Sequence, residues 1–424
     1  MLFDFQPTGR NKKFRLRQLY YITHIKNLPS ILHHGILSHD EVDRRGLSVC
    51  SIYNPAVVER RRQRTVDGKP LTRFANLYFQ PTNAMLYQVI AQEAIRLTNS
   101  GSLIRPSPLS TAELWRRAAS QFAIIAVEKK VLRLKGVKVT DGNAASDKTQ
   151  IYDVSKVDWV LEEVGDFLES NTWNNEDDSK WRRMAEVLVP NRVPPEYIRD
   201  IYVATRNAVQ QLCRSVPHNL IPQPSLFFLP LRTVKLPNTN ITLVEGDMFF
   251  SRMQTLTISV NCVGVMGAGL ASRAKWQFPR LYVEYQKMCK ERKLDLGRPQ
   301  IVRMEKSLSE TLLDDVGALN GTLPGTWFLL FPTKRHFRQK ASMHGIKKGL
   351  EYVVTHYEEW GIESLAVPAL GCGLGWLSWA HVGPLICSIL QKLHIPVEVY
   401  LPLESPRSIP DEQMSPEFLL THHS

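Results

Sequence analysis

The sequence predicts two domains, an α+β domain of mixed helices and strands followed by an α/β domain with a mixed, mostly parallel sheet. Its 424 residues exceed the usual size of one domain, so two domains of about 200 residues each are expected. The second half alternates short β-branched runs with helical patterns, which is typical of a parallel sheet covered by helices. Five prolines lie between the halves, from Pro217 to Pro237, and proline at this density interrupts helices and central strands.

These features set the expected boundaries. The first domain is predicted at residues 1–212, a Pro-rich linker at 213–240, the second domain at 241–403 and a polar tail at 404–424. The apolar segment 225–231 indicates that the linker packs against another part of the protein. The tail is polar and contains three prolines, so we expect it to be poorly ordered.

The first half contains helix and strand signals in mixed order. Residues 27–35 predict a short helix that ends at a glycine. Residues 122–127 and 186–189 are apolar runs that predict buried strands, the second of which ends at a proline. The polar segment 173–179 between them predicts a loop.

The second half predicts strands and helices in near alternation. The strands are expected at 241–244, 257–260, 327–331, 364–367 and 397–400, and the helices at 269–277, 279–293, 341–358 and 378–392. Strands separated by helices of this length form parallel sheets with helices on their faces.

The net charge of +12 favours a polyanionic partner such as nucleic acid. Basic side chains cluster in residues 10–17 and 59–64. A single basic run is as often a solvated face, but two runs in one half point to a nucleic-acid substrate.

Other classes of protein are excluded by what the sequence lacks. No apolar run reaches the roughly 18 residues that a membrane-spanning helix needs, and the first residues do not match a signal peptide. The six cysteines are scattered, with no C-x-x-C pair and no spacing typical of zinc ligands. We therefore expect a cytoplasmic protein with no membrane partner and no bound metal.

Two glycine-rich segments stand out in the second half. They are SVNCVGVMGAGLA at 259–271 and AVPALGCGLG at 366–375, and each leads from a strand signal into a helical pattern. That order directs backbone N–H groups and a helix N-terminus toward one spot, where glycine allows close approach of the backbone. Two such loops facing each other predict a clamp for a nucleotide diphosphate.

Four motifs make the second half similar to the macrodomain family, specifically its DNA-directed, DarG-like branch. They are VEGD at 244–247, VNCVGVMGAGL at 260–270, FPTKRHF at 331–337 and PALGCGLG at 368–375. The resemblance covers residues 241–403. It implies a three-layer αβα macrodomain that takes ADP-ribose as ligand and removes ADP-ribose from DNA.

The resemblance also implies roles for residues of this cleft. Asp247 is expected to hold the adenine amino group, and Asn261 the distal ribose. The loop backbone is expected to cradle the diphosphate at Gly264, Val265, Met266, Gly267, Gly269, Gly371, Cys372, Gly373, Leu374 and Gly375. From the sequence alone, Cys262 and Cys372 are interpreted as small buried residues.

Lys334 is the expected catalytic residue of the macrodomain by the same resemblance. It would either attack C1″ of the ribose or stabilise charge on the leaving base. Spacing alone would favour a solvated basic patch that includes Arg335. Trp376 departs from the small residue that many macrodomains keep after Gly375, which bears on how the loop closes over the distal ribose.

Five segments of the first half resemble the DarT family of DNA ADP-ribosyltransferases and cover most of residues 18–200. They are YYITHIKNLPSILHHG at 20–35, VERR at 58–61, LYFQPTNAMLY at 77–87, DGNAAS at 141–146 and AEVLVP at 185–190. The resemblance implies an α+β ADP-ribosyltransferase fold that uses NAD as its substrate.

Glu186 is the expected catalytic carboxylate, because cleavage of NAD builds positive charge on the ribose that a carboxylate offsets. Glu59 and Glu128 lack the matching context, and the alternative for Glu186 itself is a surface glutamate at a sheet edge. Arg61 matches the family's essential arginine. Since the pKa of arginine exceeds about 12, we expect it to bind NAD phosphates and stabilise the attacked base rather than accept a proton.

The resemblance implies a set of residues that contact NAD. They are Tyr21, Ile22, Thr23, Ser30 and Ser38. Tyr21 stands where compared relatives have histidine, and nearby His24 is expected either to share that role or to be structural. Tyr78 is expected to stack on nicotinamide or to pack in the core.

The loop 171–183 precedes Glu186, and the resemblance implies that it selects the substrate. Trp173 and Trp181 are expected to stack on an unpaired base, with Arg182 and Arg183 on phosphate, or else to anchor the loop. Arg60, Arg62 and Arg64 are interpreted as contacts to the DNA backbone or as a solvated face. Single-stranded DNA is therefore the expected partner.

Together the two resemblances imply a toxin–antitoxin pair in one chain, with a writer and an eraser of the same DNA mark. A further C-terminal domain usual in the separate antitoxin is expected to be missing, so restraint would come from erasing or from contact between the two domains. The modified base is expected to be thymine, with guanine as the alternative. A non-catalytic pair of DNA- and ADP-ribose-binding modules and an RNA-directed transferase remain the competing interpretations.

Overall fold

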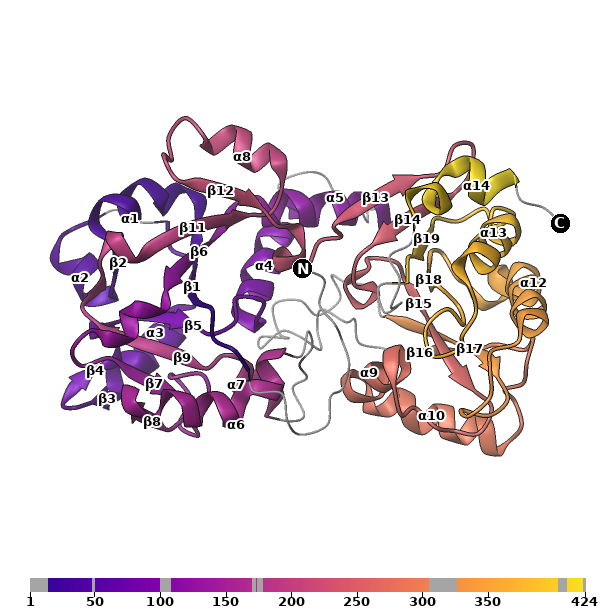
Figure 1. The fold of residues 1–424 in the computed structure, drawn as a ribbon, viewed down its shortest axis with the longest axis horizontal. Helices are drawn as coiled ribbons and strands as arrows, with labels where there is room; N and C mark the ends of the chain where they lie inside the picture. The colour runs from indigo at the N-terminus through magenta and orange to yellow at the C-terminus, as the bar shows by residue number, and fades with distance from the viewer. Residues whose placement is uncertain are drawn as a thin grey trace.

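The computed structural model describes residues 14–47, 50–99, 108–169, 173, 178–304, 326–402 and 410–421. Within these residues the chain forms two large sheets, each with its own helices (Figure 1). The start of the basic cluster 10–17 lies outside the described residues, as do residues 171, 172 and 174–177 of the predicted loop 171–183. No helix in the described part of the chain is long and apolar enough to cross a membrane.

The first domain is built on an eight-stranded, almost wholly antiparallel sheet. Its strand order is β12 (Asn219–Pro222), β11 (Ile198–Val203), β6 (Phe122–Glu128), β1 (Gln18–His24), β5 (Phe74–Tyr78), β9 (Glu186–Pro190), β7 (Lys138–Thr140) and β8 (Ile151–Asp153). The predicted strands at 122–127 and 186–189 correspond to β6 and β9. Residues 122–127 are all buried, as a strand covered on both faces requires.

Helices and two small ladders complete this domain. The helices are α1 (Leu28–His34), α2 (His39–Arg44), α3 (Pro55–Gln63), α4 (Ala84–Asn99), α5 (Pro108–Ala119), α6 (Val157–Glu169), α7 (Ser179–Arg183) and α8 (Arg206–Leu212), and the ladders pair β2 (Ile36–Leu37) with β10 (Arg192–Val193) and β3 (Thr65–Val66) with β4 (Lys69–Pro70). The short helix predicted at 27–35 is α1. It ends at Gly35, where φ is +85° and a Cβ would lie 2.2 Å from the carbonyl oxygen of Val193.

The second domain is a three-layer αβα structure. Its seven strands run in the order β13 (Arg232–Lys235), β14 (Ile241–Glu245), β19 (Val397–Tyr400), β18 (Leu365–Pro368), β15 (Thr255–Asn261), β17 (Trp327–Lys334) and β16 (Gln300–Arg303). The five central strands are parallel, and both edge strands are antiparallel. The predicted mixed, mostly parallel sheet is therefore confirmed.

Helices cover both faces of this second sheet. They are α9 (Gly269–Gln277), α10 (Pro279–Lys290), α12 (Met343–Trp360) and α13 (Trp379–Leu390). Successive residues of β17 alternate between the faces, since Phe328 packs in the same cluster as Leu281 of α10, whereas Leu329 packs with Leu350 of α12.

The predicted linker contributes a strand to each domain. Strand β12 pairs in parallel with β11, and β13 pairs antiparallel with β14, with the 3-10 turn Pro224–Phe227 between them. Both strands lie at sheet edges, where proline next to a strand removes no central hydrogen bond. This explains how a Pro-rich segment can still form strands.

The expectation of a poorly ordered tail is wrong for residues 410–421. This segment forms a 3-10 turn at Asp411–Met414 and helix α14 (Pro416–Thr421). Leu419 is fully buried against α13, and the Trp379 indole N–H donates to the carbonyl of Gln413 at 3.1 Å. A few apolar residues in a polar segment are enough to anchor it, which average composition does not reveal.

The two domains share a hydrophobic cluster. Arg252 of the second domain lies over the Trp115 ring of α5, at 3.7 Å from the ring centroid, and donates to the Tyr87 hydroxyl at 3.3 Å. The ring of Phe228, from the predicted linker, packs 5.0 Å from Tyr87 and 4.8 Å from Phe250. Contact between the domains is thus aromatic, with the partly buried cation of Arg252 at its centre.

Candidate active sites

Glu186 forms a buried ion pair with Arg61. Nη1 of Arg61 donates to both carboxylate oxygens of Glu186, at 3.2 and 3.0 Å, and the side chains are only 7% and 1% exposed. The Ala144 amide donates to the same carboxylate at 3.0 Å. The alternatives lie elsewhere, since Glu59 is 53% exposed and pairs with Arg62 on the surface. Glu128 is 27% exposed, so Glu186 is the buried one of the three candidate glutamates.

The loop 141–149 beside Glu186 is held by a residue whose role the sequence did not reveal. Arg64 donates through Nη1 to the carbonyls of Ala144, at 2.9 Å, and Ser146, and through Nη2 to that of Thr149. The interpretation of Arg64 as a contact to the DNA backbone or as part of a solvated face is therefore wrong. Its guanidinium instead supports the loop that donates to Glu186.

A cavity of about 320 Å³ brings together most of the predicted NAD contacts. It is lined by Tyr21, Thr23, Ser30 and Ser38, and by residues not foreseen, among them Asn27, His39, Tyr53 and Asn76. Ile22 points to the opposite face of β1 and packs in the core, as strand alternation requires. His24 ends the strand, and its Nδ1 accepts from the Lys26 amide, so neither Ile22 nor His24 lines this cavity.

Electrostatics connect this cavity to the ion pair. Burial, followed by the positive charge of Arg61, lowers the pKa of His39 in the cavity wall. Burial also raises the pKa of Tyr21 to about 12 and that of Tyr78, which pairs with Glu186 across β5 and β9. These three side chains stay neutral at pH 7. The acidic residue that lines the cavity is Asp43, and neither Arg61 nor Glu186 lines it. Nη2 of Arg61 is buried with no hydrogen-bond partner among the described residues, which leaves a donor for a ligand.

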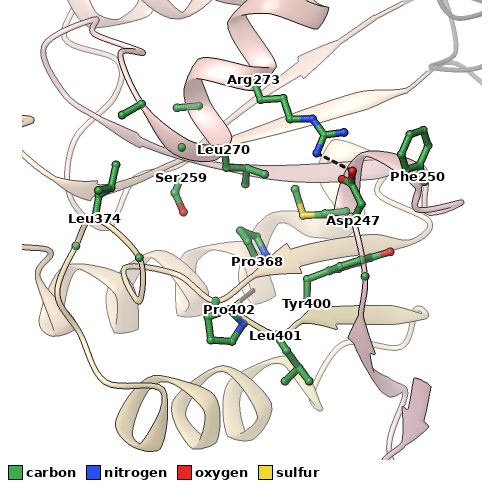
Figure 2. Close-up of a pocket in the computed structure, with 18 of the residues that line it drawn as sticks. Asp247, Phe250, Ser259, Leu270, Arg273, Pro368, Leu374, Tyr400, Leu401 and Pro402 are labelled. Atoms are coloured by element: carbon green, nitrogen blue, oxygen red, sulfur yellow. Dashed lines mark ion pairs between the residues drawn. The ribbon is translucent and has the colours of Figure 1, made fainter. Parts of the chain in front are cut away.

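The glycine-rich loops of the second domain line a cleft of about 780 Å³ (Figure 2). The predicted residues in its wall are Asp247, Asn261, Val265, Gly267, Gly269, Lys334, Gly371, Gly373, Leu374 and Gly375. Gly264, Met266 and Cys372 do not line it, and the last two side chains are buried. Residues 225–231 of the predicted linker complete one side, apart from Phe227.

Asn261, at the end of β15, holds the first glycine-rich loop in shape. Its side-chain N–H donates to the Val265 carbonyl at 2.6 Å, and its oxygen accepts from the Val263 amide and the Tyr285 hydroxyl. A buried residue with this many local bonds acts first as a scaffold. The loop backbone is therefore fixed before any ligand binds.

Asp247 is paired with a cation that sequence reasoning missed. Arg273 of α9 lies 2.7 Å from its carboxylate, as Figure 2 shows, and stacks 4.5 Å from the centroid of the Phe249 ring. Nε and Nη2 of Arg273 are buried without a hydrogen-bond partner among the described residues. Arg273 is one helical turn beyond Gly269. The only signal in the sequence for a ligand-cleft role was therefore its position shortly after a phosphate-type loop.

Lys334 lies at the opposite end of the cleft, where β17 ends. Its Nζ donates to the Leu374 carbonyl at 2.8 Å, which joins the strand to the second glycine-rich loop. Burial lowers the pKa of Lys334. A partly desolvated amine in a ligand cleft fits a catalytic lysine better than a solvated basic patch.

Comparison with known proteins identifies the family. The family model "ssDNA thymidine ADP-ribosyltransferase, DarT" matches residues 20–104 and 109–227. The DNA ADP-ribosyl transferase–DNA ADP-ribosyl glycohydrolase fusion protein of Thermosipho africanus is 47% identical over 410 residues, which cover 96% of this chain and 99% of that protein. This chain belongs to the same family of DarT–DarG fusion proteins.

Two further comparisons agree with this DarT–DarG assignment. The solved structure of Thermosipho africanus DarTG in complex with ADP-ribose superposes with a TM-score of 0.83 at 46% identity, over 95% of this chain and 100% of that one. The DNA ADP-ribosyl glycohydrolase of Mycobacterium tuberculosis is 33% identical over 170 residues, 40% of this chain and 44% of that protein.

In this member of the DarT–DarG family, the loop before Glu186 is anchored by its tryptophans. Trp173 is 2% exposed and packs against Tyr87 and Phe228, so its expected stacking on a DNA base is wrong. The Trp181 indole N–H donates to the Thr149 hydroxyl at 2.6 Å. The alternative role, anchoring the loop, is confirmed for both.

The expected phosphate contact at Arg183 is also wrong. Its guanidinium is buried and donates to the carbonyls of Thr82, Phe167 and Leu168. Of the two cysteines expected to be buried, Cys372 is buried and Cys262 is only partly buried. Burial raises the pKa of the Cys262 thiol to about 11 and that of Cys372 to about 12, so both stay protonated.

Proposed function

We propose that the first domain transfers ADP-ribose from NAD to thymine in single-stranded DNA, and that the macrodomain hydrolyses the resulting adduct. The observation that carries the first activity is the buried Arg61–Glu186 pair beside a cavity lined by polar side chains of β1, α1 and α2. The observation that carries the second is a cleft with two glycine-rich loops at its wall and a lysine at one end.

In the transfer step, the bond from nicotinamide to C1″ of the ribose breaks and a bond from C1″ to the base forms. Nicotinamide leaves with the bonding electrons, and the base loses a proton to water. The Glu186 carboxylate stabilises positive charge on the ribose as the bond breaks. Arg61 keeps that carboxylate in position, and its unpartnered Nη2 binds the developing negative charge on the base or a phosphate of NAD.

In the removal step, the neutral amine of Lys334 attacks C1″ and displaces the base, which takes up a proton. Water then hydrolyses the lysine–ribose bond, so that the products are free ADP-ribose and the original base. Asp247 binds the adenine end, and the glycine-rich loops bind the diphosphate between the two ends. One chain thus adds a toxic DNA mark and removes it.

The test uses Lys334→Ala protein, in which the adduct should persist. Incubation with NAD and a short single-stranded DNA should add the mass of one ADP-ribose, and wild-type protein added later should remove it. An RNA oligomer of the same sequence serves as the control substrate. Unchanged DNA together with unconsumed NAD would instead support a non-catalytic pair of binding modules, and guanine-containing oligomers without thymine test the choice of base.

A further inference from the structure

The rim of the macrodomain cleft next to Lys334 exposes an unusual number of large apolar side chains. Leu374 is 58% exposed and Phe337 is 44% exposed, and both line the cleft. Trp376, two residues beyond Leu374, is 78% exposed, more than any other large hydrophobic side chain of the described residues. Exposed apolar groups gathered at one rim mark a binding surface more often than scattered ones do.

The backbone presents Trp376 in a conformation that tryptophan rarely adopts. Its φ is +63°, in the left-handed region, where a bulky side chain is an outlier. The turn is held by the Trp376 amide, which donates to the Gly373 carbonyl at 3.1 Å, and by the Leu377 amide, which donates to Gly371 at 3.0 Å. The indole is thus displayed outward from a fixed loop.

Phe337 is carried by a second loop that packs directly on this turn. The Ala341 amide donates to the Gly375 carbonyl at 3.0 Å, and Lys334 donates to Leu374. A Cβ at Gly375 would lie 2.8 Å from that of Ala341, so the loops are in close contact. The two aromatic residues therefore flank the same end of the cleft.

Positive charge surrounds these rings. Residues 334–340 carry Lys334, Arg335, Arg338 and Lys340 and no acidic residue. Arg335 pairs with Asp295, while Arg338 lies 5.5 Å from the centroid of the Phe337 ring and, like Lys340, has no acidic partner among the described residues. Exposed aromatic rings among cations match the chemistry of single-stranded nucleic acid, whose bases stack and whose phosphates are anionic.

We propose that Trp376 and Phe337, with the cations of segment 334–340, form a platform for single-stranded DNA at the mouth of the macrodomain cleft. The inference rests on the proposed function, because the adduct joins C1″ to a base and its DNA strand must leave the cleft beside Lys334. Bases next to the modified one stack on the two rings, and the neighbouring phosphates contact Arg338 and Lys340. The eraser thereby recognises DNA as well as ADP-ribose.

The experiment compares two substrates in the full-length chain carrying Glu186→Gln, so that no ADP-ribose is added back. One is a single-stranded 12-mer bearing the adduct, and the other is the ADP-ribosylated nucleoside obtained from it by nuclease digestion. Trp376→Ala should raise KM for the 12-mer about 10-fold, since one stacked base is lost, and leave removal from the nucleoside unchanged. Phe337→Ala also alters the cleft wall, so it should raise KM for both substrates, and by more for the 12-mer than for the nucleoside.

Further variants separate stacking from backbone strain. Trp376→Tyr should keep a KM for the 12-mer close to that of the parent. Trp376→Gly relieves the left-handed conformation but should raise KM for the 12-mer as much as Trp376→Ala. Trp159→Ala removes an exposed tryptophan of the first domain and is the matched control. The proposed platform would be contradicted if Trp376→Ala left KM for the 12-mer unchanged, or raised KM equally for the 12-mer and the nucleoside. If the parent chain releases nothing from either substrate, the proposed removal activity is wrong instead.

Discussion

Arg61 and Glu186, 125 residues apart in the sequence, form one buried ion pair in which a single guanidinium nitrogen contacts both carboxylate oxygens. Strand β9 supplies the carboxylate and helix α3 the guanidinium cation, and the pair is almost closed to solvent. Burying two charges is costly unless they are paired and hydrogen-bonded. A site retained at such a cost is a strong candidate for catalysis.

Glu186→Gln should lower the rate of transfer to DNA about 10²–10³-fold, because a neutral amide does not offset the charge on the ribose. It should also destabilise the first domain by about 3–5 kcal/mol, because Arg61 is left as an unpaired buried charge. Transfer is measured by mass spectrometry in a Lys334→Ala background, where product accumulates, and stability by urea unfolding. Glu59→Gln, which alters an exposed glutamate of α3, is the control, and equal activity of the two variants would rule out the assigned role.

The removal of ADP-ribose should speed up as the pH rises and then level off. The lowered pKa of Lys334 means that its neutral, nucleophilic form is reached at a lower pH than for an exposed lysine. Below that pKa the rate should increase about tenfold per pH unit, because the neutral fraction does. The measurement is the pH–rate profile on an adduct-bearing oligomer, with ADP-ribose affinity measured at each pH.

Lys334→Arg should be inactive in removal, because a guanidinium stays charged and cannot attack C1″. Its binding of ADP-ribose should be retained, which isothermal titration would show. If Lys334→Arg stayed active and the rate of the wild-type chain fell at high pH, Lys334 would instead act as a cation that stabilises the charge on the leaving base.

Cells expressing the Lys334→Ala chain should stop growing, while cells expressing the wild-type chain should grow. The physical reason is that the transferase site lies in a different domain from Lys334 and stays intact in this variant. Adding Glu186→Gln to Lys334→Ala should restore growth. Colony counts after induction test this, with immunoblots to match expression, and equal growth of wild type and Lys334→Ala would argue against an active eraser.

Arg252→Ala should loosen the contact between the two domains. A desolvated cation over an aromatic ring contributes about 2 kcal/mol, and Arg252 also donates to Tyr87. We expect a lower Tm and faster proteolysis within residues 213–240. Arg280→Ala, at an exposed position on α10, is the control. Unchanged proteolysis of Arg252→Ala would show that the domains are held together by other contacts.

Leu419→Ala should destabilise the macrodomain by about 2–5 kcal/mol, because it leaves a cavity where a fully buried side chain packs on α13. The check is the midpoint of urea unfolding followed by tryptophan fluorescence. Glu412→Ala, at an exposed position of the 3-10 turn before α14, should leave the midpoint unchanged. A shared midpoint for both variants would mean that α14 does not support the domain.

Much of the macrodomain could be predicted because its signals are local. Helix α9 has the predicted bounds 269–277, and all five predicted strands correspond to strands of the structure. An apolar run followed by glycines and a helical pattern is readable within about a dozen residues. Glu186 was identified through the resemblance of AEVLVP at 185–190 to the DarT family, because the local pattern alone also fits a surface glutamate at a sheet edge.

The edge strands β12 and β13, the burial of Trp173 and the roles of Arg64 and Arg273 could not be predicted in this way. Each depends on groups distant in the sequence, such as Asp247 for Arg273 and the loop 144–149 for Arg64. A tryptophan in a polar loop has the same local pattern whether it faces DNA or a neighbouring helix.

The sequence by itself determined the five central strands, the main helices and the phosphate-type loops of the macrodomain, because backbone preferences and apolar periodicity act over short distances. The tertiary structure alone decided which charges meet, which aromatic rings are buried between the domains and which stand exposed at the cleft. Those outcomes depend on how segments far apart in the chain pack, and packing follows from the shapes of both partners together.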